Sequence, residues 1–208
     1  MEISLQISLN REYSGSYFET RGVSKEVFDE FFLGMSLPHP SLTPFLVNQP
    51  TFPVYDFMGE LKGYAFRPGD KDCKYMNGGF KKIDQLYGIH LAIPAIMEQN
   101  SVIITEGYFD VLIPFTHGIR NVVAIFGNTI SEQQAAILAS YTNNFILALD
   151  SDNSGLAGAE KSERVIKRLF PSVNITRKLV YPQKDLADYV QTLGGLDDGQ
   201  RESEETNI

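Results

Sequence analysis

Four carboxylates follow two apolar, strand-like runs of the sequence. The runs are Val102–Thr105 and Phe145–Leu149, and the acids are Glu106, Asp110, Asp150 and Asp152. In an open sheet of parallel strands, ligands bind beyond the carboxyl ends of the strands, so we expect the two acidic sets to lie side by side. Crowded carboxylates repel one another, and hard divalent cations with oxygen ligands, Mg²⁺ or Mn²⁺, relieve that repulsion. The spacing therefore predicts a divalent-metal site.

Two other interpretations of these acids follow from the residues alone. Acidic side chains commonly cap helices, so Glu106 and either Asp150 or Asp152 are also suited to the starts of the helices that follow. The Asp150-x-Asp152 spacing also begins like a calcium-binding EF-hand loop, but that loop needs an acid at its twelfth position, where this chain has Lys161. We reject the calcium loop and keep helix capping as the alternative.

The second half of the chain has the pattern needed to bring the acids together. From residue 89 onward, strand-like runs alternate with helical patterns, which predicts an α/β fold with a parallel sheet and flanking helices. Ser131 and Gln134 have the spacing of a capping box at a helix start. The helix after the second acidic run is expected to turn Leu156 inward. We expect residues 93–195 to form this domain.

The first half of the sequence predicts a smaller, basic α+β subdomain that precedes the parallel sheet along the chain. Residues 1–50 combine a strand-like start, a helix capped by Ser24 and a proline-rich connection, whereas residues 51–92 are strand-rich, basic and contain a hairpin. One apolar stripe of the capped helix is expected to face the core: Val27, Phe28, Phe31 and Phe32. Residues 196–208 form an acidic tail that we expect to be disordered.

Composition limits the possible classes of function. The 208 residues are 43% hydrophobic and 21% charged, as in ordinary globular proteins, and we expect neither a membrane span nor a secretory signal. Cys73 is the only cysteine, which excludes an internal disulfide and a cysteine-based zinc site in this sequence and favours a cytoplasmic location. The net charge of −8 excludes a globally basic nucleic-acid binder, so any such binding should be local, weak and salt-sensitive.

Whole motifs in the chain resemble a known family. The segments EGYFDV at 106–111 and DSDNSG at 150–155 are similar to the acidic motifs of the Toprim domain in bacterial DnaG-type DNA primases. Further segments resemble the primase catalytic core in the same order: Tyr17–Ser24, Phe52–Asp56, Lys74–Asn77 and Gln85–Gly88. The resemblance extends over residues 13–195, and the upstream segments make it specific to primases.

The resemblance implies a function and a set of site residues. It implies a core that makes short RNA primers on single-stranded DNA from ribonucleoside triphosphates, with two or more Mg²⁺ or Mn²⁺ ions. The implied catalytic residues are Glu106, Asp150 and Asp152, and the implied metal ligands are these three with Asp110 and Asp185. The implied contacts to nucleotide phosphates or template are Arg67, Lys74 and Lys82, since Arg and Lys suit phosphate.

The third acidic motif departs from the family pattern. DnaG-type primases typically have Asp-Pro-Asp here, whereas Asp185 and Asp188 are three residues apart. We prefer Asp185 as the ligand because it is nearer the end of the preceding strand. Asn128 likewise stands where the family pattern leads us to expect threonine.

Two alternative functions remain open at this point. The same acids and metal would serve phosphodiester hydrolysis in a Toprim-type nuclease. The chain would alternatively be a primase subunit that depends on a replicative helicase or on a separate zinc-ribbon protein. The family's zinc-ribbon and helicase-binding modules are not recognisable in this sequence, which favours such partners.

Overall fold

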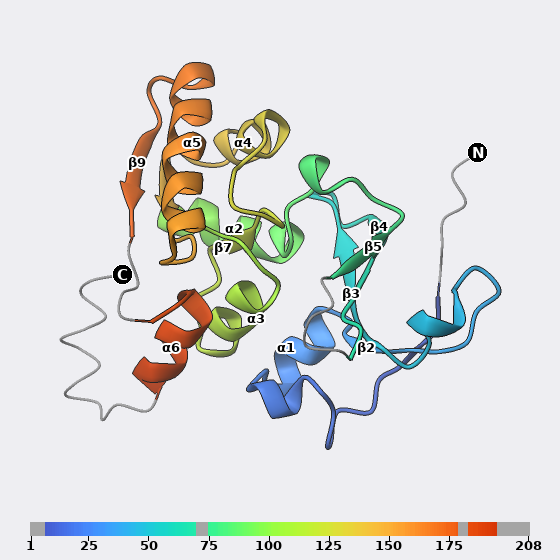
Figure 1. The fold of residues 1–208 in the computed structure, drawn as a ribbon. Coiled ribbons are helices and arrows are strands. Elements are labelled where there is room, and N and C mark those ends of the chain that lie inside the picture. Colours follow the sequence, from blue (N-terminus) through green and yellow to red (C-terminus); the bar gives the residue numbers. More distant parts are fainter. Residues whose placement is uncertain (1–6, 70–74, 179–182, 195–208) are drawn as a thin grey trace. The chain divides into compact units, whose positions relative to one another are not determined.

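The structure is a computed structural model and describes residues 7–69, 75–178 and 183–194 (Figure 1). The chain divides into two compact units, Met1–Lys81 and Lys82–Ile208. The first unit holds a five-stranded antiparallel sheet and the second a four-stranded parallel sheet.

The antiparallel sheet of the first unit has the strand order β1-β2-β3-β4-β5. Its elements in chain order are β1 (Leu9–Asn10), η1 (Glu19–Arg21), α1 (Lys25–Glu30), β2 (Gly34–Ser36), η2 (Pro44–Leu46), β3 (Pro50–Tyr55), β4 (Leu61–Phe66) and β5 (Met76–Gly78). The β3–β4 hairpin confirms the hairpin expected from the sequence. Strand β3 begins inside the stretch that we interpreted as a connection. Pro50 still contributes to the sheet because its carbonyl accepts the N–H of Arg67 at 2.9 Å.

Helix α1 confirms most of the expected apolar stripe. Ser24 caps it, since its Oγ accepts the N–H of Val27 at 3.3 Å. Phe28 is fully buried, and its ring centroid lies 5.6 Å from that of Phe18. Phe32, however, is 51% exposed, so its expected place in the core was wrong. The helix ends at Glu30, and a φ of 52° at Phe32 reverses the chain and turns the ring outward.

The parallel sheet of the second unit confirms the predicted α/β fold. Its elements in chain order are η3 (Lys82–Asp84), α2 (Ile89–Gln99), β6 (Val102–Thr105), α3 (Phe109–Thr116), β7 (Val122–Ala124), α4 (Glu132–Ala139), β8 (Asn144–Leu147), α5 (Asn153–Leu169), β9 (Asn174–Arg177) and α6 (Leu186–Gly194). The strand order is β7-β6-β8-β9, and all three pairings are parallel. Strands β6 and β8 are therefore neighbours, and their carboxyl ends adjoin.

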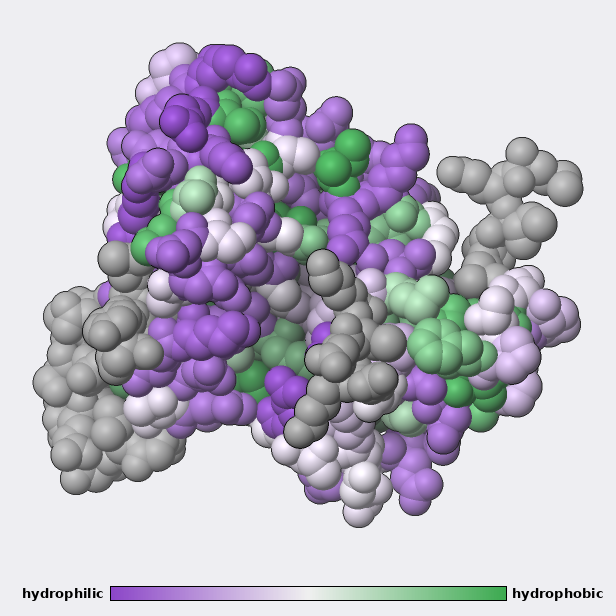
Figure 2. All heavy atoms as spheres, viewed as in Figure 1, coloured by the Kyte–Doolittle hydropathy of each residue, from purple (hydrophilic) through white to green (hydrophobic). Residues whose placement is uncertain are grey.

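Helix α5 lies along β9 and packs on α4 (Figure 1). The capping box of Ser131 and Gln134 at the start of α4 is present as predicted. Leu156 is 40% exposed, so its expected inward position was wrong. The buried face of α5 consists mainly of small residues: Gly155, Gly158, Ala159, Ser162 and Ile166. Figure 2 shows a largely hydrophilic surface over the outer side of this helix.

None of the helices in the described part of the chain combines the length and apolar character needed to cross a lipid bilayer.

Candidate metal centre

The end of β6 places Glu106 against the loop that follows β8. Its Oε1 accepts the backbone N–H of Asp150 at 3.2 Å. The pKa of Glu106 is raised from 4.5 to about 7, first by burial and then by the negative charges of Asp150 and Asp152, while the hydrogen bond from the Asp150 N–H and the charge of Lys184 oppose the rise. The two predicted acidic segments therefore meet, as the parallel-sheet interpretation required.

Asp110 lies in the first turn of α3 and is only 7% exposed. Its Oδ2 accepts the N–H of Gly107 at 3.1 Å, and its Oδ1 accepts the N–H of Ala187 at 3.3 Å. Burial, followed by the charges of Asp185 and Asp150, raises the pKa of Asp110 well above its ordinary value. Asp110 thus joins the turn after β6 to the start of α6.

Asp152 has the capping role that the alternative interpretation assigned to it. Its Oδ1 accepts the N–H of Gly155 at 2.8 Å and caps α5. Glu106 does not cap α3, whose N-cap residue is Tyr108. The cap and the metal-site interpretations are compatible for Asp152 because a carboxylate has a second oxygen.

The start of α5 is held very close to the loop after β8 and to the loop between β7 and α4. A Cβ atom at Gly155 would lie 2.1 Å from the carbonyl oxygen of Asp150, and one at Gly158 would lie 1.9 Å from that of Asn128. Asn128 also donates from Nδ2 to Ser154 Oγ at 2.8 Å. The residue found in place of the expected threonine therefore helps to fix the helix that carries Asp152.

Asp185 and Asp188 differ clearly in their surroundings. The side chain of Asp185 is 17% exposed, and its Oδ1 accepts the N–H of Asp188 at 2.9 Å, which holds it at the start of α6. Asp188 itself is exposed on the first turn of that helix. Asp185 acts on the pKa of Asp110 and of Asp150, so it belongs to the same group of acids.

Lys184 enters the group of acids, although its sequence position had suggested no role for it. Its Nζ lies 3.6 Å from Asp150 Oδ2 and 3.5 Å from Asp185 Oδ2. Burial alone would lower the pKa of Lys184, but the two carboxylates outweigh it and raise the pKa above its ordinary value. The sequence did contain a signal for this lysine, because Lys184 directly precedes Asp185, the preferred acid of the third acidic motif.

The acids fit a hard divalent cation by their chemistry. They supply oxygen donors from three segments of the chain, and burial, followed by the charges of neighbouring carboxylates, raises the pKa of Glu106 and of Asp110. Two buried oxygens beside the acids, Ser151 Oγ and Gln183 Oε1, have no hydrogen-bond partner, as is common where a water or an ion belongs. Within the described residues, however, no three His, Cys, Asp or Glu side chains form a ready-made cage.

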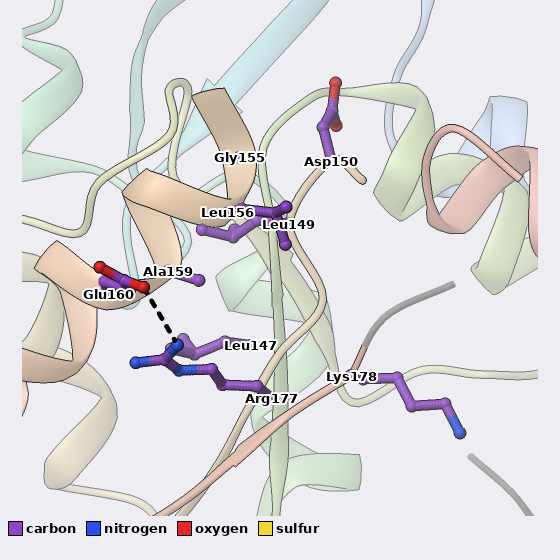
Figure 3. A pocket seen from close by; sticks show the side chains of 9 residues that line it. All are labelled: Leu147, Leu149, Asp150, Gly155, Leu156, Ala159, Glu160, Arg177 and Lys178. Carbon is purple, nitrogen blue, oxygen red and sulfur yellow. Dashed lines mark ion pairs between the residues drawn. The ribbon is translucent and has the colours of Figure 1, made fainter. Parts of the chain in front are cut away.

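A pocket of about 240 Å³ reaches the centre between α5 and β9 (Figure 3). Leu147, Leu149 and Leu156 contribute apolar lining, and Asp150 lies at one end. Arg177 pairs across the pocket with Glu160 at 3.9 Å. The pocket lining ends at Asp150, whose carboxylate points away from the other lining side chains (Figure 3).

The three predicted phosphate-binding residues belong to other parts of the chain. Arg67, in the first unit, lies with its guanidinium 4.9 Å from the ring centroid of Tyr75. Lys82, at the start of the second unit, is exposed, and its carbonyl accepts a hydrogen bond from Gln134 at 2.9 Å. Lys74 lies outside the described residues. Their role in binding phosphate remains a prediction.

The raised pKa of Glu106 predicts a pH-dependent stability of the metal-free protein. Between pH 4.5 and about 7, the folded protein keeps a proton that the unfolded chain has released, so the free energy of unfolding should fall as the pH rises. We expect a loss of roughly 1 to 2 kcal/mol after allowance for solvent screening. Thermal melts in EDTA at pH 5 and pH 8 would measure it.

The matched variant for this prediction is Glu106→Gln, which cannot ionise and can still accept the Asp150 N–H. It should be more stable than the wild type at pH 8 and nearly equal to it at pH 5. Saturating Mg²⁺ should also flatten the pH dependence of the wild type. A melting temperature that rises from pH 5 to pH 8 in EDTA would contradict the assignment.

Comparisons with known proteins agree with this geometry. Residues 103–190 match a family model described as Toprim-like. The DNA primase of Borreliella burgdorferi is 32% identical over 166 residues, which cover 77% of this chain and 31% of that protein. The DNA primase of Aquifex aeolicus is 30% identical over 206 residues, which cover 83% of this chain and 40% of that protein. The chain thus spans well under half the length of these relatives.

Solved structures show the same fold. The crystal structure of the zinc-binding and RNA polymerase domains of Aquifex aeolicus primase matches with a TM-score of 0.74 and 27% identity, over 94% of this chain and 55% of that chain. A DnaG primase catalytic domain bound to single-stranded DNA matches with a TM-score of 0.73 and 23% identity, over 94% of this chain and 74% of that chain. Because each of these matches covers 94% of this chain, each includes parts of both units.

Proposed function

Because the chain carries a Toprim domain of the DnaG primase type, we propose that it is a DNA primase catalytic core. It would synthesise short RNA primers on a single-stranded DNA template from ribonucleoside triphosphates, as a nucleotidyltransferase. The observation that carries the proposal is the meeting of two acidic strand ends, where Glu106 accepts the N–H of Asp150 at 3.2 Å. Since its relatives are bacterial DNA primases, we place its activity in the cytoplasm.

We assign the metal-binding role to five acids: Glu106, Asp110, Asp150, Asp152 and Asp185. Two or more Mg²⁺ or Mn²⁺ ions, when bound, would neutralise charge on the triphosphate and on the attacking and leaving oxygens. Glu106 would serve either as a metal ligand or as the acceptor of the proton from the attacking hydroxyl. Asp110 supports the site by joining Gly107 to Ala187 through both of its oxygens.

Arg67, Lys74 and Lys82 are the proposed contacts to nucleotide phosphates or the template backbone. Arg67 is suited to this role because stacking on Tyr75 orients its planar guanidinium while leaving its N–H groups able to form a fork on a phosphate. With a net charge of −8, the chain should bind its template weakly, and raising the salt concentration should weaken that binding further.

The proposed partners follow from the fact that the chain matches only 31% and 40% of the length of two related DNA primases. The matching Aquifex aeolicus structure contains a zinc-binding domain in addition to an RNA polymerase domain. We propose that a separate zinc-ribbon protein or a replicative helicase completes the activity if the chain acts as a core on its own. Adding either partner should then raise primer yield.

One assay separates the candidate functions. The protein is incubated with single-stranded DNA, Mg²⁺ or Mn²⁺ and labelled ribonucleotides. Labelled oligoribonucleotides support the primase, whereas shortened DNA without nucleotide incorporation supports the Toprim-type nuclease. Products that form only after a helicase or zinc-ribbon partner is added support the dependent subunit. Absence of any product, both without and with a partner protein, would contradict the proposal.

The choice between the two late acids gives a further prediction. Asp185→Asn should lower Mn²⁺ affinity and primer yield by about tenfold, because it removes one negative charge from the group of acids. Asparagine retains an oxygen for the Asp188 N–H, so the start of α6 should survive. Asp188→Asn is the matched control and should leave both quantities unchanged. Equal losses in the two variants would contradict the assignment.

A further inference from the structure

The ammonium group of Lys184 lies between two carboxylates of the metal centre. Its Nζ is 3.6 Å from Asp150 Oδ2 and 3.5 Å from Asp185 Oδ2. The backbone of the same residue is anchored, since its carbonyl oxygen accepts the N–H of Ser151 at 2.8 Å. The backbone of Lys184 is therefore held beside the loop that follows β8.

The lysine side chain is largely exposed to solvent. It is 67% exposed, whereas the side chains of Asp150 and Asp185 are 19% and 17% exposed. An ammonium on a flexible four-carbon stem is a compact point charge that regains its hydration when it leaves the carboxylates. Leaving the site thus costs the protein little, provided that another cation takes over the two acids.

We propose that Lys184 is a positioning residue that acts as a built-in counter-cation of the metal centre. This inference rests on the proposed function of the centre. The ammonium pairs with Asp150 and Asp185 when no divalent cation is bound, and it yields both carboxylates to the metal when one arrives. An ammonium and a metal ion cannot both occupy the space between the same two oxygens. Lys184 therefore sets the metal concentration at which the centre fills.

The same residue explains how the metal-free protein tolerates its acids. Glu106, Asp110, Asp150, Asp152 and Asp185 are gathered at one end of the sheet. Like charges at this spacing destabilise the folded state, and a cation among them offsets part of that cost. The lysine would thus hold the loop after β8 and the start of α6 in place before metal binds.

The test is a Mn²⁺ titration of the full chain, with free Mn²⁺ followed by electron paramagnetic resonance. Lys184→Met removes the charge and keeps the length, and it should bind Mn²⁺ about tenfold more tightly than the wild type. Lys184→Arg keeps the charge and should not gain affinity. Lys178→Met is the matched control, because the Lys178 ammonium points away from Asp150 (Figure 3), and it should bind like the wild type.

A second measurement uses no metal. In EDTA, Lys184→Met should melt several degrees below the wild type and Lys178→Met should not, and saturating Mn²⁺ should remove the difference. Unchanged or weaker Mn²⁺ binding by a folded Lys184→Met protein, while the wild type binds Mn²⁺, would overturn this inference alone. Failure of the wild type itself to bind Mn²⁺ would overturn the metal centre and the proposed function with it.

Discussion

Asp152→Asn is expected to lower ribonucleotide incorporation by at least about 100-fold while leaving the fold intact. Asp152 Oδ1 accepts the N–H of Gly155 at 2.8 Å, and an asparagine oxygen can accept the same hydrogen bond, so α5 keeps its cap. What the variant loses is a negative charge next to Glu106 and Asp150. Primer yield on single-stranded DNA and the melting temperature would measure the two effects separately.

Asp152→Ala is the companion variant, because it removes the cap together with the carboxylate. It should be as inactive as Asp152→Asn but less stable by about 1 kcal/mol, the usual cost of losing an N-cap side chain. The pair thus separates the metal role of Asp152 from its structural role. Unchanged primer yield from a folded Asp152→Asn protein would remove the metal role.

Gly155→Ala is expected to destabilise the protein strongly. Alanine in a helix normally stabilises by about 1 kcal/mol relative to glycine. Here the new Cβ would lie 2.1 Å from the carbonyl oxygen of Asp150 and 2.8 Å from its carbonyl carbon, so backbone must move. We expect a net loss of about 3 kcal/mol and a melting temperature lower by roughly 10 °C. Mn²⁺ affinity should fall too, because the loop that moves carries Asp150 and Asp152.

Gly127→Ala provides the matched control for this substitution. A Cβ at Gly127 would meet no atom within 4 Å, and this glycine does not have the left-handed φ that disfavours other residues. Its melting temperature and Mn²⁺ affinity should stay close to those of the wild type. If the Gly155→Ala protein had the same melting temperature as the wild type, the close approach of α5 to Asp150 would not constrain the site.

The sequence was sufficient to predict the elements that carry the acids. Alternation of apolar runs with helical patterns predicted the parallel sheet, and the short acidic motifs marked the strand ends of β6 and β8. Ser24 and Ser131 predicted two helix starts because an N-cap depends on residues only three positions apart. These features are local, so a single sequence contains the information for them.

The features that were missed depend on contacts between distant segments. Lys184 meets Asp150 only because the chain after β9 returns to the loop after β8, with the Ser151 N–H bound to its carbonyl. Leu156 has the type of a core residue, but the buried face of α5 near this residue is filled by glycine and alanine. Phe32 lies beyond the actual end of α1, and such ends are the least reliable part of a periodicity argument.

The strand order also determines when the centre can exist during synthesis of the protein. Strands β6 and β8 pair directly, with Ile104 opposite Leu147, yet β7 and α4 are translated between them. A nascent chain that has just emerged through α4 therefore carries Glu106 without Asp150, Asp152 or Lys184. Because Lys184 and Asp185 are translated just before α6, an unfinished chain that stops short of them lacks part of the proposed metal centre.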